Sequence, residues 1–156
     1  MSVEITPKGT RGASVPSFPG WMMRAALGLL IGAYRLSGGR MKMFGVPLLV
    51  LTTVGARSGK TRRVPITWFP DRPDSRLVVA SLGGAANHPA WFYNLARNPD
   101  KVWIEVRGRT IKVRPETLEG AERAEAWKRV VAAYKGYGAY ETKTDRVIPV
   151  IRLIDQ

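Results

Sequence analysis

A glycine-rich basic turn, TTVGARSGKTRRVP at positions 52–65, lies between two runs of strand-forming residues. A phosphate-binding loop of the GxxxxGK[ST] type has four residues between its glycines and opens a helix. Here only three residues separate Gly55 from Gly59, and the segment RRVPITWF that follows alternates apolar and polar residues with a period of two. That period is typical of a strand. The turn therefore joins two strands, and the chain is expected to contain antiparallel β-structure.

The same turn holds a dense set of groups that can bind an anion. Its two glycines allow the backbone to reverse tightly and to approach a ligand closely. Hydroxyl and cationic side chains are concentrated around them: Arg57, Ser58, Lys60, Arg62 and Arg63. Because side chains alternate along a strand, Arg62 and Arg63 should face opposite sides, so one of them is expected to serve the same ligand as Lys60. The alternative is a solvated basic turn without a ligand.

Further strand and helix signals place this hairpin in a mainly β protein with helices, an α+β fold. β-Branched and leucine-rich runs predict strands at 47–55, 62–69, 76–81 and 147–153, and KVWIEV with TIKVRP predicts a hairpin across residues 107–109. Helical spacing recurs at 21–36, at 90–98 and over 117–134. Six antiparallel strands joined by short turns, with helices inserted rather than alternating, indicate a small barrel with packed helices.

The N-terminal region is strongly basic. The net charge is +13, and residues 1–63 hold ten of the 25 Lys and Arg residues but only one acid, Glu4, so nine excess charges lie there. Such asymmetry fits an anionic partner, which could be a polyanionic cofactor, nucleic acid or a membrane surface. Three prolines and three glycines in residues 1–20 predict a flexible arm ahead of one domain at residues 21–156.

Residues 21–36 predict an amphipathic helix ended by a glycine pair. Its longest uncharged run, residues 25–34, is about half of the ~20 residues that a membrane span needs. The helix either covers the barrel or a subunit interface, or brings residues 1–42 to an anionic membrane surface. We therefore expect a cytoplasmic protein, with the inner face of the cell membrane as a candidate peripheral site. With no cysteine and one histidine, no metal site is expected.

A second segment, ASLGGAANHPAWFYNLARNP at positions 80–99, passes from a strand end through a glycine pair into a helix. The glycines free backbone amides, and the proline suits the first helical turn. An aromatic and an amide side chain three residues apart can share one helix face. An apolar wall with a few polar groups suits a flat ring, although the aromatic residues can equally be ordinary core. The candidate ligand contacts are Ala80, Ser81, Gly83, Gly84, Trp91 and Asn94.

Three blocks occur in order: LLVLTTVGARSGKTRRVPI, ASLGGAANHPAWFYNLARNP and AAYKGYGAYETKTDRVIPVIRL. Together they resemble the deazaflavin-dependent nitroreductase family, split-barrel proteins of actinobacteria that use coenzyme F420. The similarity covers about residues 20–156. It implies a split β-barrel that binds reduced deazaflavin, and an F420-dependent reductase that passes a hydride to an electron-poor acceptor such as a quinone, an activated alkene or a nitroaromatic.

The resemblance also implies roles for the conspicuous residues. The basic turn would hold the cofactor phosphodiester through Arg57, Ser58 and Lys60, with Arg62 or Arg63 assisting. Backbone groups of Ala80, Ser81, Gly83 and Gly84 would run beside the ring, and Trp91 and Asn94 would flank the ring and the polyglutamate tail. The chain departs from the family pattern at Leu82, where lysine is common, and at His88, where asparagine or lysine is usual.

Three tyrosines spaced by three, Tyr134, Tyr137 and Tyr140, are candidates for the acceptor pocket. Phenols are protonated at neutral pH and can donate hydrogen bonds, and Ser81 is a second candidate donor. The intervening glycines predict a mobile loop that could act as a lid. The alternative is three surface tyrosines at a helix end.

Two other classes of protein remain open at this point. One is a split-barrel oxidoreductase that uses FMN, and the other is a non-catalytic basic module for nucleic acid or lipid. We expect no nucleic-acid partner, because the aromatic residues do not interleave with basic residues on one strand face. A homodimer is expected to be possible, because split barrels often dimerise.

Overall fold

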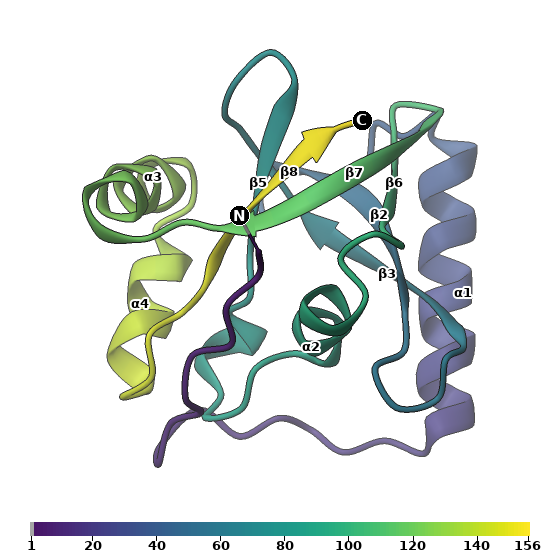
Figure 1. Cartoon of the computed structure of the whole chain (residues 1–156). Helices are drawn as coiled ribbons and strands as arrows, with labels where there is room; N and C mark the ends of the chain where they lie inside the picture. The colour runs from purple at the N-terminus through teal and green to yellow at the C-terminus, as the bar shows by residue number, and fades with distance from the viewer. Residues whose placement is uncertain (1) are drawn as a thin grey trace.

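Within residues 2–156, which the computed structural model describes, eight antiparallel strands curl into a half-barrel (Figure 1). The strands are β1 (Lys42–Met43), β2 (Val46–Val54), β3 (Thr61–Thr67), β4 (Phe69–Pro70), β5 (Ser75–Val79), β6 (Trp103–Val106), β7 (Arg109–Thr117) and β8 (Val150–Asp155). Their order is β1-β2-β6-β7-β8-β5-β4, and β3 also pairs with β2. Only Trp68 separates β3 from β4, so the chain itself links distant parts of the sheet. The predicted split barrel is confirmed, with two short strands more than expected.

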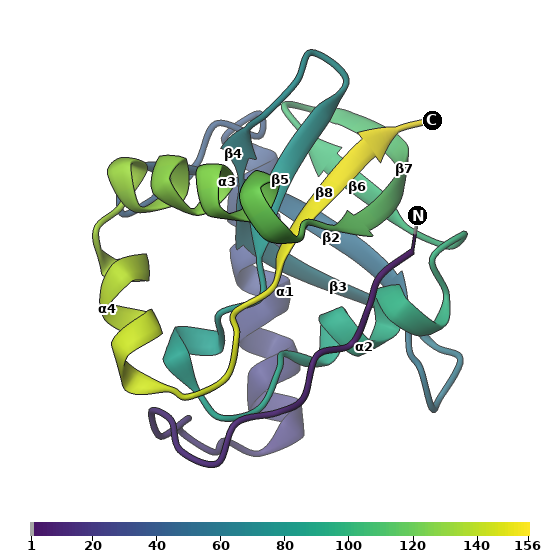
Figure 2. The ribbon, with the colours of Figure 1, turned by 60° about the vertical axis from the view of Figure 1, so that its left-hand side comes forward.

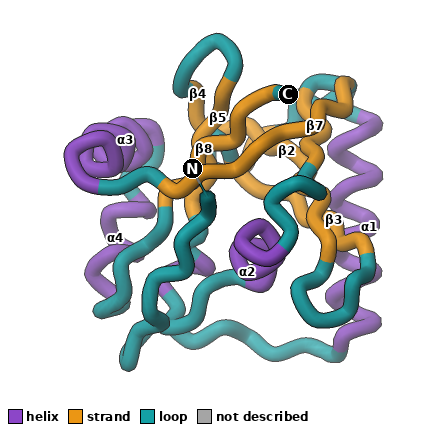
Figure 3. The backbone as a smooth tube through the Cα atoms, viewed as in Figure 1, coloured by secondary structure: helices purple, strands orange, loops and turns teal. Residues whose placement is uncertain are grey.

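Helices lie outside this sheet, and loops gather at its lower end (Figure 3). In Figure 1, α1 lies on the right, α3 and α4 on the left, and α2 at the lower end of the barrel. Figure 2 shows α3 and α4 together on their side of the sheet. The helices are α1 (Gly20–Leu36), the single-turn 3-10 helix η1 (Leu82–Gly84), α2 (Ala90–Arg97), α3 (Gly120–Ala133) and α4 (Gly136–Lys143).

Both predicted hairpins form, and each has a local cause. Seven residue pairs join β2 to β3, and β3 pairs with β2 alone. The strand is therefore an edge strand, which tolerates Pro65 because proline cannot donate to a second neighbour. Between β6 and β7, Arg107 and Gly108 have φ values of 49° and 77°. These are the left-handed conformations that a two-residue type I′ turn requires.

Apolar side chains form three buried clusters: one inside the barrel, one beneath α3 and α4, and one beneath α1. Helix α1 is buried through Ile31 and Tyr34, and the Tyr34 hydroxyl donates to the Glu105 carbonyl at 3.1 Å. Several of its other large apolar side chains are exposed, namely Trp21, Met22, Met23, Leu29 and Leu36. Among residues 2–156, no helix combines the length and the apolar character needed to cross a bilayer.

Tyr137 and Tyr140 lie on the helix α4 and Tyr134 follows the end of α3, so the predicted loop at this segment was wrong. Glycine has a poor helix propensity, but two glycines here provide room for close packing. A Cβ at Gly136 would lie 2.3 Å from a ring carbon of Tyr134, and one at Gly138 would lie 3.4 Å from Val131 of α3. Close packing against α3 therefore outweighs the local preference for a loop.

A buried ionic network ties the loop before β5 to β8. Arg152 donates to Asp71 at 2.5 Å and to Glu116 at 3.1 Å, and all three side chains are almost fully buried. Burial alone would raise the pKa of Asp71, but hydrogen bonds from Arg152, Ser75 and Arg129 outweigh it and hold that pKa below its ordinary value. Removal of Arg152 would leave the buried carboxylates of Asp71 and Glu116 with only Arg129 and Arg114 as ion-pair partners in residues 2–156, which is costly for buried charges.

Residues 3–13, here named the N-terminal strap, run along the lower part of the molecule (Figure 2). Val3 is buried in the barrel cluster. Backbone N–H groups of Gly9 and Ala13 donate to the carbonyls of Ala86 and Gly84 at 2.8 and 2.9 Å. Residues 14–26 are all exposed. The segment predicted as an arm thus has defined contacts in its first part and leads through an exposed linker into α1.

Candidate functional site

The basic turn is a tight reversal between β2 and β3. The Gly55 N–H donates to the Lys60 carbonyl at 2.8 Å, and the Gly59 N–H donates to the Gly55 carbonyl at 3.0 Å. Gly59 has a φ of 67°, and a Cβ at Gly55 would lie 2.5 Å from Ser58 Oγ. The Lys60 N–H donates to the same Ser58 hydroxyl at 3.2 Å. Both glycines are therefore required by the shape of the turn.

The cations of this turn are solvent-exposed, and none has an anionic partner within the described residues 2–156. They are Arg57, Lys60, Arg62 and Arg63. No carboxylate of residues 2–156 lies within ion-pair distance of any of them. Four cations held close together repel one another, and a bound anion would relieve this repulsion. The turn is thus able to hold an anionic group without breaking an existing ion pair.

Asn94 of α2 fixes the position of the turn. Its Oδ1 accepts from the Ala56 N–H at 2.9 Å, and its Nδ2 donates to the Thr53 hydroxyl at 3.1 Å. One helical turn later, Asn98 Nδ2 donates to the Val54 carbonyl at 3.2 Å. Asn94 is buried, and its amide groups are engaged with the protein. It therefore shapes the turn through these bonds rather than offering a free amide to a ring.

The glycine loop, residues 80–85, follows the end of β5 and includes η1. Ala80 and Ser81 are buried, whereas Leu82 is exposed and has a φ of 44°. A Cβ at Gly84 would lie 2.8 Å from the Tyr140 carbonyl, so the absence of a side chain lets the loop approach α4. The loop and the tyrosine segment are thus brought together.

The three tyrosines form a continuous aromatic row. Ring centroids of Tyr134 and Tyr137 lie 5.7 Å apart, and those of Tyr137 and Tyr140 lie 5.5 Å apart, both edge to face. Phe44 stacks on Tyr134 at 5.0 Å with nearly parallel rings. The Tyr137 hydroxyl lies 2.5 Å from Thr67 Oγ1 at the end of β3. The row therefore connects α4 to the barrel, and Tyr137 is a buried member of it rather than a surface tyrosine.

Burial strengthens proton binding by two phenols of this row. It raises the pKa of Tyr137, which the hydrogen bond with Thr67 only partly opposes. Burial also raises the pKa of Tyr140, and neighbouring Tyr134 adds to the effect. Both groups therefore carry a proton at neutral pH and can act as hydrogen-bond donors.

Strand β3 connects the two halves of the candidate site. The basic turn precedes Thr61, and Thr67 at the other end contacts the tyrosine row. Six residues at a rise of ~3.3 Å place the two ends about 20 Å apart. Trp91 on α2 is half-buried and packs against the barrel cluster, so it combines a core role with partial access. The basic turn and the tyrosine row thus lie at opposite ends of one strand.

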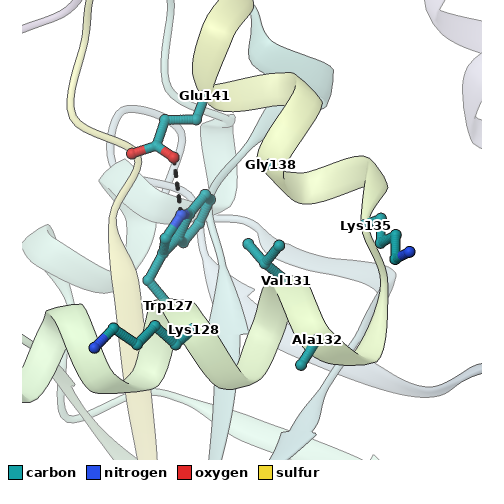
Figure 4. A pocket seen from close by; sticks show the side chains of 7 residues that line it. All are labelled: Trp127, Lys128, Val131, Ala132, Lys135, Gly138 and Glu141. Atoms are coloured by element: carbon teal, nitrogen blue, oxygen red, sulfur yellow. Dashed lines mark hydrogen bonds between the residues drawn. The ribbon is translucent and has the colours of Figure 1, made fainter.

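A separate groove lies between α3 and α4 (Figure 4). Its volume is about 640 Å³, and the indole Nε1 of Trp127 donates to Glu141 at 2.9 Å within it. Its lining contains none of the predicted site residues. The groove is lined by Trp127, Lys128, Val131, Ala132, Lys135, Gly138 and Glu141.

Two residues of the site were missed by sequence reasoning. Phe44 lies beside Gly45 in a turn, and nothing local indicated its stacking on Tyr134, 90 positions later. Arg146 is buried and contacts the glycine loop. Its position in TDRVIPV gave one usable signal, a charged residue directly before an apolar strand. His88, which departs from the family pattern, is buried beside this arginine.

The curled sheet, the unpaired basic turn and the aromatic row together define a split-barrel oxidoreductase. Two solved structures share this fold. One is an F420-H2 dependent reductase (FDR-A), 40% identical, with a TM-score of 0.61 over 69% of this chain and 93% of that chain. The other is described as a domain-swapped dimer, 33% identical, with a TM-score of 0.63 over 83% of this chain and 98% of that chain.

The model of the F420H(2)-dependent quinone reductase family matches residues 30–155, so the chain belongs to this family. A Mycobacterium tuberculosis F420H(2)-dependent quinone reductase is 32% identical over 77% of this chain and 83% of its own length. A candidate F420H(2)-dependent quinone reductase of the same species is 38% identical over 69% of this chain and 89% of its own length. The predicted resemblance, enzyme class and coenzyme F420 are confirmed, and mycobacterial relatives fit the actinobacterial expectation.

Proposed function

We propose that the chain transfers a hydride from reduced F420 to a quinone at the lower end of the barrel. The observation that carries this is the basic turn, whose exposed cations have no carboxylate partner in residues 2–156 and whose backbone is fixed by Asn94. Such a set of cations and hydroxyls fits a phosphodiester. The half-buried Trp91 and the glycine loop fit a flat ring.

The turn is assigned to the cofactor phosphodiester through Arg57, Ser58 and Lys60. Because Arg62 and Arg63 face opposite sides of β3, one of them assists. The ring is assigned to the backbone of the glycine loop, including Ala80, Ser81, Gly83 and Gly84. Asn94 acts by holding the turn, and Trp91 by closing one side of the ring site.

The chain's own contribution to the reaction is orientation of the acceptor and donation of a hydrogen bond. Reduced F420, when bound, supplies a hydride as a two-electron unit. When a quinone takes up a hydride, the resulting hydroquinone anion carries negative charge on an oxygen. A hydrogen-bond donor aimed at that oxygen stabilises the charge. Tyr137 and Tyr140 are the donors we assign, with Ser81 as a second candidate; an ordinary phenol is protonated at neutral pH, and the raised pKa values of these two move them further from ionisation. Tyr134 and Phe44 form the wall against which the quinone ring lies.

A comparison of acceptors tests the quinone assignment. The purified chain is mixed with reduced F420 and, in turn, a naphthoquinone, an activated alkene and a nitroaromatic, and the return of oxidised F420 is followed by absorbance. We expect the naphthoquinone to give the largest kcat/KM. A larger value with either of the other acceptors would reject the quinone as the preferred substrate class while leaving the cofactor assignment intact.

The exposed side of α1 supports a further proposal, peripheral contact with a membrane. Trp21, Met22 and Met23 are exposed beside Arg24, a combination suited to the interface of an anionic bilayer. Many quinones dissolve in membranes, so such contact would bring enzyme and acceptor together. Co-sedimentation with phosphatidylglycerol vesicles should fall when Trp21, Met22 and Met23 are replaced by serine, because the apolar side chains exposed on α1 are then lost. Unchanged pelleting of this variant would contradict the proposal.

A homodimer is the other proposed partner. The support is one relative of this chain, whose solved structure is a domain-swapped dimer. Light scattering at several protein concentrations distinguishes a dimer from a monomer. A mass equal to one chain at every concentration would reject it.

A further inference from the structure

Arg146 is a buried guanidinium that bonds to the glycine loop. Its Nε donates to the Ala85 carbonyl at 2.7 Å, and its two terminal nitrogens donate to the carbonyls of Ala80 at 3.1 Å and Ser81 at 2.6 Å. It is 6% exposed. Thus three carbonyls from one short loop converge on a single side chain.

No carboxylate in the described part of the chain forms an ion pair with this arginine. Burial lowers the pKa of Arg146, but an arginine remains charged at any physiological pH. A buried charge is costly unless hydrogen bonds compensate it, and here the compensation comes from Ala80, Ser81 and Ala85. The loop carbonyls must therefore stay turned toward Arg146 for as long as the protein is folded.

The same guanidinium fixes the tautomer of His88. Arg146 can only donate, so the His88 Nδ1 at 3.1 Å is an acceptor and the ring hydrogen lies on Nε2. That Nε2–H donates to the Thr6 carbonyl of the N-terminal strap at 2.8 Å. A continuous series of hydrogen bonds thus runs from the glycine loop through Arg146 and His88 to the strap.

Other contacts hold the strap to the same region. Asp145, next to Arg146 in sequence, accepts from the backbone N–H of Thr10 at 2.8 Å and of Arg11 at 3.2 Å. The Thr144 hydroxyl donates to the Arg11 carbonyl at 2.9 Å. The strap therefore lies across the residues that shape the loop, and a change in one requires new partners for the other.

We propose that Arg146 is a positioning residue that fixes the glycine loop for F420 and, through His88, couples cofactor binding to docking of the strap. This rests on the proposed function, because the loop is assigned there to the ring. Lysine keeps the charge of arginine but cannot reach four acceptors from one planar fork. The coupling should therefore be lost in Arg146→Lys although the charge remains.

Tryptic cleavage after Lys8 and Arg11, both exposed in the strap, reports strap docking, and F420 fluorescence reports binding. In the wild type, F420 should slow cleavage at these two sites. Arg146→Lys should lose about tenfold in F420 affinity, within the range of typical coupling energies, and its cleavage should not respond to F420. The exposed Arg109→Lys is the matched control and should behave as wild type. Wild-type affinity and protection in Arg146→Lys would overturn the proposal.

His88→Phe separates the two parts of the proposal. It keeps a ring against Phe92 and Tyr93 but removes the bonds to Arg146 and Thr6. We expect F420 affinity within about threefold of wild type and cleavage of the strap that no longer responds to F420. If F420 protects the strap of His88→Phe from trypsin as well as it does in the wild type, the coupling is overturned. This test holds even if Arg146→Lys fails to fold. If the wild type does not bind F420, the proposed function fails instead. The link between loop and strap is then tested without cofactor, and strap cleavage rates in both variants equal to the wild-type rate would overturn it.

Discussion

The replacement Asn94→Ala tests whether α2 positions the basic turn. It removes two hydrogen bonds, from the Ala56 N–H at 2.9 Å and to the Thr53 hydroxyl at 3.1 Å. The Thr53 side chain is 1% exposed and would lose a buried partner, at a cost of about 1–3 kcal/mol. Ala56 is half-buried, so water can replace part of its bond, and about 1 kcal/mol is lost there.

The expected total is therefore a fall of about 2–4 kcal/mol in the free energy of unfolding, measured by urea denaturation. A typical domain of this size has ~5–15 kcal/mol, so the variant should remain folded. F420 affinity, measured by fluorescence titration, should fall as well, because the turn would no longer be held in one place. Asn98→Ala is the matched control: it removes one bond just after the same helix, to the Val54 carbonyl, and Val54 is also held by its pairing with Thr61, so F420 affinity should stay nearly unchanged. An Asn94→Ala protein with reduced stability but wild-type affinity would refute the positioning of the turn by α2.

Two further predictions concern the tyrosine row and the buried histidine. Tyr137→Phe loses the bond to Thr67 and should lower quinone kcat by about tenfold or more with an unchanged F420 Kd; unchanged turnover in stopped-flow assays would remove Tyr137 from the acceptor site. Burial lowers the pKa of His88. The charge of Arg146 adds to this lowering, and the hydrogen bond to Thr6 opposes it; Tyr93 is the other titratable group beside the ring. Because the unfolded chain binds this proton more readily, with a pKa near 6.5, the free energy of unfolding should decrease as the pH falls below that value; His88→Phe should show a weaker decrease in urea titrations, and an equal decrease in both proteins would contradict the assignment.

Local patterns were sufficient to predict most of the strands and the basic turn. The period-2 alternation of RRVPITWF and the glycines around Ser58 determine a hairpin without help from the rest of the chain. The turn across Arg107 and Gly108 is determined only in part by its own residues: glycine adopts a positive φ readily, whereas the φ of 49° at Arg107 is imposed by the two-residue connection between β6 and β7. These elements depend on contacts within a few residues, and single-sequence reasoning captures such contacts well.

Long-range packing explains what the sequence did not reveal. Helix α4 contains two glycines that locally favour a loop, and its stability comes from contacts with α3 and with Tyr134. Arg146 contacts carbonyls more than 60 residues earlier in the chain, and no local pattern indicates which carbonyls a buried arginine will meet. Asn94 was predicted as a ligand contact, whereas its engagement with Ala56 and Thr53 depends on how α2 is docked beside β2.

A titration with F420 tests the central proposal most directly. Oxidised F420 is added to the wild type and to Lys60→Ala, and its fluorescence is followed to saturation, with FMN as a competing ligand. We expect one F420 per chain with a Kd of about 10 µM or tighter for the wild type, a Kd raised about tenfold or more in Lys60→Ala, and little displacement by FMN. Absence of saturable F420 binding, or equal affinity in the two proteins, would contradict the assignment of the basic turn to the cofactor phosphodiester.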